Sequence, residues 1–113
     1  MNNYLTSKQK LILFFIKMEF ATDQYRLIRL FDTADFPVEL GINLRPLLEN
    51  ELIKVAGYLD NETEFKYSIT EKGIKYIEVY QSDSELIEYI GSMQNPKLIL
   101  ECTQNLLRRK NGL

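Results

Sequence analysis

The chain has 113 residues, of which 45% are hydrophobic and 27% charged, and its formal net charge is −2. This length and balance are typical of one globular domain with a single core. No apolar run approaches the roughly 18 uncharged residues of a membrane-spanning helix, and no signal-peptide cleavage site follows the first apolar run. The single cysteine, Cys102, excludes an internal disulfide framework and fits a reducing compartment. We therefore expect a cytoplasmic protein with no membrane partner.

The residue types that are missing narrow the possible chemistry. The sequence contains no histidine, which excludes histidine-based catalytic triads and histidine metal sites. One cysteine cannot form a thiolate zinc site, and the glycines stand singly, so no glycine-rich phosphate loop is present. Carboxylates are abundant but fall in no catalytic motif. We expect no enzymatic activity, no metal and no cofactor.

Two helices are predicted in the first third of the chain. Thr6 and Gln9 have the spacing of a capping box and open a helix to about Met18. Residues 11–16 of this helix are all apolar, which predicts that it lies at the centre of the core. Thr22 is a second candidate cap, before a helix over residues 23–31. In that helix Tyr25, Ile28, Leu30 and Phe31 are expected on one side and Arg26 and Arg29 on the other.

The stretch over residues 38–53 predicts a helix-turn-helix. Leucines recur there at helical spacing, but a proline inside a helix is destabilising, and Pro46 interrupts a continuous helix. Gly41 is expected to end a short helix and Asn43 to cap a new one, which leaves Pro46 in the first turn. A short helix, a tight turn and a second helix result.

The second half of the chain predicts one hairpin followed by helices. Residues 54–59 and 64–69 flank a short polar loop, and the second segment alternates apolar and polar side chains, as a strand does. Thr70 is expected to cap a helix to about Tyr80. Ser82 and Glu85 open a further helix, and a last one runs from Pro96 to Lys110. The fold class is mainly α with a small β-hairpin (α+β).

The predicted order of three helices, a hairpin and a further helix resembles the winged-helix-turn-helix fold of bacterial transcriptional regulators, in particular the MarR and PadR families. Residues 5–9 resemble the opening of the first core helix in MarR-type domains, residues 44–53 a recognition helix leading into the wing, and residues 67–73 the end of the wing. The resemblance covers residues 5–80, a winged-helix domain, and leaves residues 81–113 as a C-terminal helical extension. Two departures are Glu51, where the families usually have glycine, and the acidic wing tip at residues 60–64.

The resemblance implies a transcriptional regulator that reads double-stranded DNA through the helix after Asn43 and through the 54–69 hairpin. The candidate DNA-binding residues are Asn43, Arg45, Lys54, Lys66, Arg26 and Arg29. Arginine can form two hydrogen bonds to guanine and asparagine two to adenine, whereas lysine and arginine also neutralise phosphates. Asn43 is equally well interpreted as a helix cap, and Arg45 as a solvated surface residue.

The charge distribution keeps a second function open. Residues 35–64 hold two cations and seven carboxylates, a net charge of −5, whereas residues 7–29 have a net charge of +3. A surface that reads DNA should be positive. The alternative is therefore a winged helix that binds a protein partner and not DNA. The leucine and isoleucine content of residues 81–113 further predicts a homodimer built partly on the extension.

Overall fold

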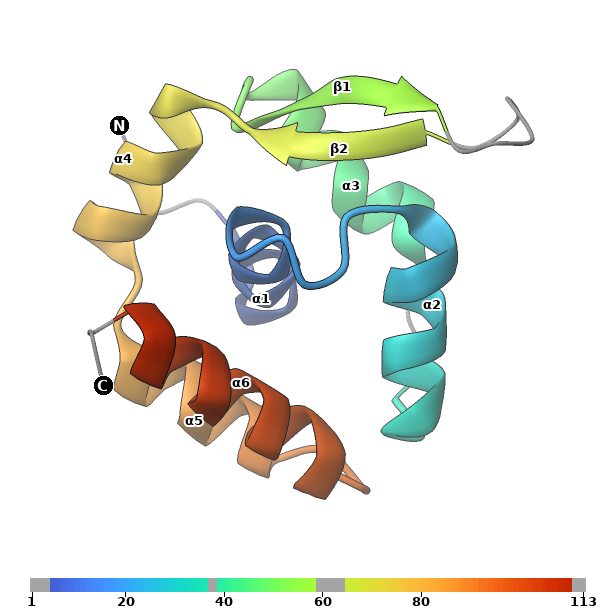
Figure 1. The fold of residues 1–113 in the computed structure, drawn as a ribbon, viewed down its shortest axis with the longest axis vertical. Coiled ribbons are helices and arrows are strands. Elements are labelled where there is room, and N and C mark those ends of the chain that lie inside the picture. Colours follow the sequence, from blue (N-terminus) through green and yellow to red (C-terminus); the bar gives the residue numbers. More distant parts are fainter. Residues whose placement is uncertain (1–4, 37–38, 59–64, 111–113) are drawn as a thin grey trace.

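The computed structural model describes residues 5–36, 39–58 and 65–110 of the chain. Within these residues the elements follow the order α1 (Ser7–Lys17), α2 (Gln24–Thr33), α3 (Leu40–Glu49), β1 (Ile53–Tyr58), β2 (Phe65–Ile69), α4 (Glu71–Tyr80), α5 (Asp83–Gly91) and α6 (Lys97–Lys110). A two-stranded antiparallel hairpin thus follows three helices and precedes three more (Figure 1). This confirms the predicted fold class and is compatible with winged-helix topology.

Helix α1 is the centre of the molecule, as its sequence predicts. Its first turn is closed by the expected capping box, in which the Gln9 amide N–H donates to Thr6 Oγ1 at 3.2 Å and the Thr6 N–H to Gln9 Oε1 at 3.0 Å. Every residue from Leu11 to Ile16 is at most 1% exposed. Figure 1 shows the hairpin on one side of α1 and α5 and α6 on the opposite side. The other elements therefore pack around one apolar helix.

The hairpin is extended by a short third strand segment that precedes α2. Strand β1 pairs with β2 in the register Ile53 to Ile69 and Val55 to Tyr67, with a bulge between Val55 and Gly57. On the other edge of β2, Asp23 pairs with Lys66 in an isolated bridge, and the Tyr67 N–H donates to the Thr22 carbonyl at 2.8 Å. This pairing holds the start of α2 against the sheet. The predicted hairpin loop at residues 60–63 lies outside the described residues.

The predicted cap of α2 was wrong, and its predicted inner face was right only for Leu30 and Phe31. Because the Thr22 carbonyl is paired with β2, the helix begins one residue later, and Asp23 is its N-cap, with Oδ1 accepting from the Arg26 N–H at 2.8 Å. In this register Leu27 and Phe31 face the core and are at most 1% exposed. Two of the side chains expected to face inward are instead exposed, Tyr25 by 53% and Ile28 by 42%.

The predicted break in α3 was also wrong. One helix runs from Leu40 to Glu49 with Pro46 in its interior, and Asn43 is not a cap. The proline removes one hydrogen bond, the one to the carbonyl of Ile42. Ile42 is 61% exposed, so water can reach that end of the helix and the missing bond costs less than it would in the core. Leu40, Leu44 and Leu47 are buried, and their packing holds the helix together.

The predicted cap of α4 is confirmed. It explains why threonine and glycine stand at positions 70 and 73 in the segment that resembles the end of a wing. Thr70 Oγ1 accepts from the Gly73 N–H at 3.0 Å, and its hydroxyl lies 2.6 Å from the Glu51 carbonyl, to which it donates. Gly73 faces the backbone carbonyl of Leu52 so closely that a Cβ there would collide with it. Thr70 and Gly73 together hold the first turn of α4 against Glu51 and Leu52, the two residues that precede β1.

Helices α5 and α6 belong to the same core as α1. Their buried side chains lie in one cluster with those of α1, namely Leu86, Ile90, Met93, Ile99, Leu106 and Leu107. The junction between α4 and α5 is also tied to α1, because Lys10 Nζ donates to the Tyr80 carbonyl at 3.1 Å and Gln81 Nε2 to the Lys10 carbonyl at 3.3 Å. The apolar content of the extension is therefore used within the chain. The homodimer, which was inferred from that content, stays a prediction.

Three acidic residues have left-handed backbone conformations. Glu19, Asp35 and Glu51 have φ values of 56°, 56° and 59°, and each directly follows the C-cap residue of α1, α2 or α3. Glycine is the usual residue at this position because a Cβ makes the left-handed conformation costly. A negative charge there is also unfavourable beside the C-terminal end of a helix dipole. Glu51 is the position at which the resembling families usually have glycine, and its conformation gives the physical reason.

We expect Gly73→Ala to lower the free energy of unfolding by about 1–3 kcal/mol, because the added methyl group must displace the Leu52 carbonyl or part of β2. Gly91→Ala in α5 is the matched control: its Cβ meets nothing within 4 Å, so stability should be unchanged or slightly higher. Urea unfolding of both variants measures the difference. Equal stability of the two would contradict the close approach at Gly73.

We expect Glu51→Gly to raise the free energy of unfolding by about 0.5–1 kcal/mol, because glycine adopts the left-handed conformation without strain and the unfavourable charge is removed. Glu49→Gly, two residues earlier and within α3, should instead lower it by about 1 kcal/mol. Thermal and urea unfolding of the two variants should therefore shift in opposite directions. A loss of stability in both would show that Glu51 makes a stabilising contact that outweighs its backbone strain.

Candidate functional site

Helix α3 presents one narrow exposed face, which we call the α3 face: Ile42, Arg45, Leu48 and Glu49. The opposite side of the helix is fixed by Leu44 and Leu47, which are 2% and 0% exposed. At 100° per residue the four residues of the α3 face lie within about a third of the helix circumference. Ile42 is 61% and Leu48 37% exposed, so apolar groups make up much of this surface. Arg45 lies between them.

The two candidate base-reading residues differ in what they offer. Arg45 is exposed and, among the described residues, forms no hydrogen bond or ion pair, so its guanidinium is free to bind a partner. Asn43 is half-buried, and its Nδ2 donates to the Glu39 carbonyl at 2.9 Å within the same helix. Pairing with adenine through both amide atoms would have to compete with this bond. Arg45 is therefore available to bind a partner, whereas the side chain of Asn43 is already hydrogen-bonded within the chain.

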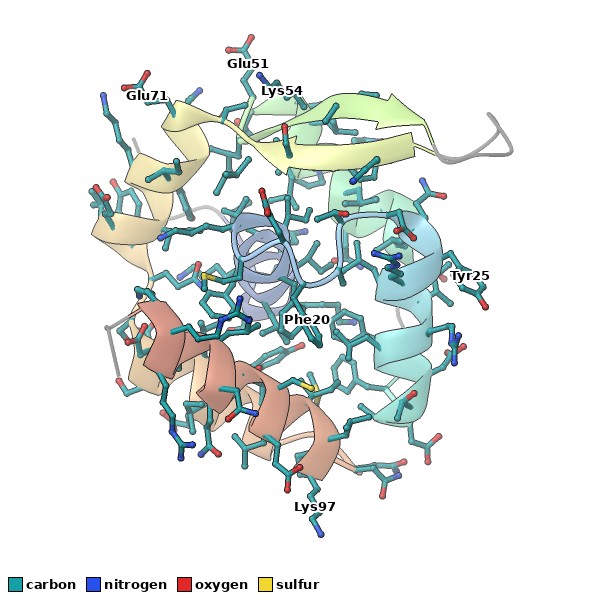
Figure 2. The ribbon with its side chains drawn as sticks, in the orientation of Figure 1. Phe20, Tyr25, Glu51, Lys54, Glu71 and Lys97 are labelled. Carbon is teal, nitrogen blue, oxygen red and sulfur yellow. The ribbon has the colours of Figure 1, made fainter. Side chains whose placement is uncertain are left out.

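Lys54 and Lys66 lie on the outer face of the hairpin. Lys54 pairs with Ser68 and Lys66 with Gly57, and both lie on the face opposite the buried Ile53 and Tyr67. Figure 2 shows Lys54 projecting from the sheet away from α1. Neither lysine has a carboxylate within ion-pair distance in the described part of the chain. Two neighbouring positive charges repel each other when no carboxylate lies between them. An anionic ligand bound there would reduce this repulsion.

Arg26 lies next to this pair. Its Nε is 3.5 Å from Asp23 Oδ2, and Asp23 is the residue that pairs with Lys66 at the edge of the sheet. Asp23 is only 2% exposed, so its carboxylate is a structural cap of α2 and not a surface charge. We call Arg26, Lys54 and Lys66 the sheet cations.

The six predicted DNA-binding residues come from three parts of the fold. Asn43 and Arg45 belong to α3, Lys54 and Lys66 to the two strands of the hairpin, and Arg26 and Arg29 to α2. The guanidinium of Arg29 lies 5.6 Å from the ring centroid of Tyr25.

Two lysines of the basic segment at residues 7–29 do not add to an exposed positive surface. Lys10 is 91% buried and donates to the Tyr80 carbonyl, and the ammonium group of Lys8 lies 4.7 Å from the ring centroid of Phe36. Both lysines are thus engaged within the chain.

The exposed Ile42 and Leu48 were missed by sequence reasoning, which placed Ile42 in a turn and Leu48 among inward-facing leucines. The error follows from the predicted break at Gly41 and Asn43. In a single helix from Leu40, the 3.6-residue period places Ile42 opposite Leu44 and Leu47. A continuous helix places Ile42 outward, whereas Leu48 lies only about 40° around the helix from the buried Leu44, so periodicity alone does not show that Leu48 is exposed.

The described residues hold few other groups that suggest chemistry. They contain no cluster of three or more acidic, cysteine or histidine side chains that could hold a metal ion, and no helix long and apolar enough to cross a membrane. Cys102 is half-buried, and burial, followed by the nearby Glu101 carboxylate, raises the pKa of its thiol. A raised pKa disfavours the reactive thiolate.

Comparisons of this chain with protein-family models, with curated proteins and with solved structures found no match. The site must therefore be interpreted from its own geometry and charge.

Proposed function

We propose that the protein is a winged-helix interaction module that binds a protein partner through the α3 face. The observation that supports this most directly is the exposure of Ile42 and Leu48 on the two sides of Arg45. Large exposed apolar side chains that share one face of a helix are candidates for a protein-binding surface. A helix that enters the major groove of DNA presents mainly polar and basic groups, whereas this face has one cation, one carboxylate and two large apolar side chains.

The energetics favour the same partner class. Fully burying an isoleucine or leucine contributes about 1.5–3 kcal/mol, so covering the exposed parts of Ile42 and Leu48 contributes roughly 2 kcal/mol. On DNA the apolar contact available to these side chains is the thymine methyl group. A protein surface can cover both side chains and also supply a carboxylate to Arg45. The partner we infer is an apolar surface, such as one face of a helix, with an acidic residue opposite Arg45.

The partner surface can be tested with matched serine variants of the full chain. We expect Ile42→Ser and Leu48→Ser to abolish the capture of a common set of proteins from cell extract, because each substitution removes an apolar contact at the centre of the face. Val79→Ser is the control, since Val79 is 69% exposed on α4, outside the α3 face. Quantitative mass spectrometry of the captured proteins compares the three with wild type. The same proteins in all four samples would overturn the proposal.

Duplex DNA is the second candidate, favoured by a separate observation. Arg45, Lys54 and Lys66 are exposed and carry no acidic partner in the described part of the chain. The resemblance to MarR and PadR regulators also supports DNA binding, with α3 as the recognition helix and the hairpin as the wing. In this case the protein would be a transcriptional regulator, with Arg45 reading a base and the lysines contacting phosphates.

The two functions predict opposite results for random-sequence duplex DNA in fluorescence anisotropy. If the two lysines contact phosphates, affinity should fall about 12-fold between about 50 and about 200 mM salt. Lys66→Ala should then weaken binding to every sequence alike, and Arg45→Ala should relax sequence preference. We expect no binding at either salt concentration, because residues 35–64, which include α3 and β1, hold two cations against seven carboxylates. Binding that is steep in salt and lost on removing Lys54 and Lys66 would establish DNA as the ligand.

A further inference from the structure

A second surface, away from the α3 face, is built along α2 and the start of α6. One open depression of about 450 Å³ is lined on α2 by Tyr25, Arg26, Arg29, Leu30 and Thr33 and on the preceding loop by Phe20. Another, of about 500 Å³, begins at the same Thr33 and extends over Pro96, Lys97, Leu98 and Glu101. Thr33 lines both depressions, and we call the surface over the two the α2–α6 groove.

The groove has exposed apolar anchoring points. Phe20 is 37% exposed, and its ring packs against the buried ring of Phe15 with 5.7 Å between centroids. Leu98 is 47% exposed at the other end of the groove. Figure 2 shows Phe20 in front of α1, on the side of α2 nearer to α6, and Lys97 at the first turn of α6. A ligand can thus bury an apolar group at each end.

The charges that line the groove are mainly positive. Arg26, Arg29 and Lys97 line it against one carboxylate, Glu101, although the whole chain has a net charge of −2. The guanidinium of Arg29 lies over the Tyr25 ring at 5.6 Å, and its Nη1 donates to the Tyr25 hydroxyl at 3.4 Å. These contacts orient Arg29 without neutralising it, and no carboxylate of the described residues pairs with Arg29 or Lys97.

From this combination we propose that the α2–α6 groove binds an acidic peptide segment of a second protein, with apolar side chains over Phe20 and Leu98 and carboxylates at Arg29 and Lys97. Charge complementarity selects this occupant: an anionic segment meets two unpaired cations, whereas a neutral apolar segment would leave them desolvated. A peptide also supplies the apolar groups that the groove needs at its two ends. None of the lining residues belongs to the α3 face, so this site does not depend on the proposed function.

The test uses the full chain and short fluorescein-labelled peptides in fluorescence anisotropy. One peptide alternates glutamate with phenylalanine and leucine, and its matched control has glutamine in place of every glutamate. We expect the acidic peptide to bind more tightly than the control. Arg29→Gln and Lys97→Gln should each weaken the acidic peptide by about 2- to 5-fold, the usual effect of one exposed charge pair, and leave the control peptide unchanged.

Two further measurements keep the site distinct from the α3 face. Arg45→Gln removes an exposed cation outside the groove and should not change peptide affinity. Amide chemical shifts should change in α2 and the first turn of α6 and not in α3. Equal binding of both peptides, insensitivity to Arg29→Gln and Lys97→Gln together, or shift changes confined to α3 would each overturn the proposal. Tighter binding of single-stranded DNA than of the acidic peptide would assign the groove to nucleic acid instead.

Discussion

The burial of α1 is the constraint on which the rest of the structure depends. Six consecutive apolar residues, Leu11 to Ile16, project around the whole circumference of this helix, so it cannot lie on a surface. It has to be covered from every side, and one additional layer cannot do so. The hairpin covers one side and α5 and α6 the opposite side, with α3 and α4 also packed on α1. The C-terminal extension is therefore part of the core that holds the other helices and the hairpin around α1.

This packing also determines which surfaces remain free. Because α3 covers α1 with its leucines, the opposite side of α3 carries Ile42, Arg45 and Leu48 into solvent. The pairing of Thr22 and Asp23 with β2 places the start of α2 at the sheet, and the Asp23 cap then sets the register of that helix. As a result Arg26 lies beside Asp23 and, together with Tyr25 and Arg29, lines the α2–α6 groove. Two surfaces of different character thus result from one core.

Sequence patterns predicted the elements well where a local interaction decides the structure. The caps at Thr6, Thr70 and Ser82 hold in the structure because each bonds a backbone N–H within the next three residues. The patterns were wrong at Thr22 and Asn43, where a partner distant in sequence decides the outcome. Thr22 is engaged by β2, and the leucines of α3 keep that helix continuous through Pro46. For the candidate site, the sequence identified Arg45 but not the apolar residues beside it.

By itself, the sequence determined the order of the elements, the approximate bounds of every helix except α3, the hairpin and the central place of α1, because these depend on periodicity and on short-range capping. It also determined that positive charge is scarce between residues 35 and 64. Only the tertiary structure decided which side of α2 and α3 faces solvent. It alone also placed the start of α6 beside Thr33 at the end of α2. Helix rotation and the proximity of distant residues are set by packing, and no local pattern contains them.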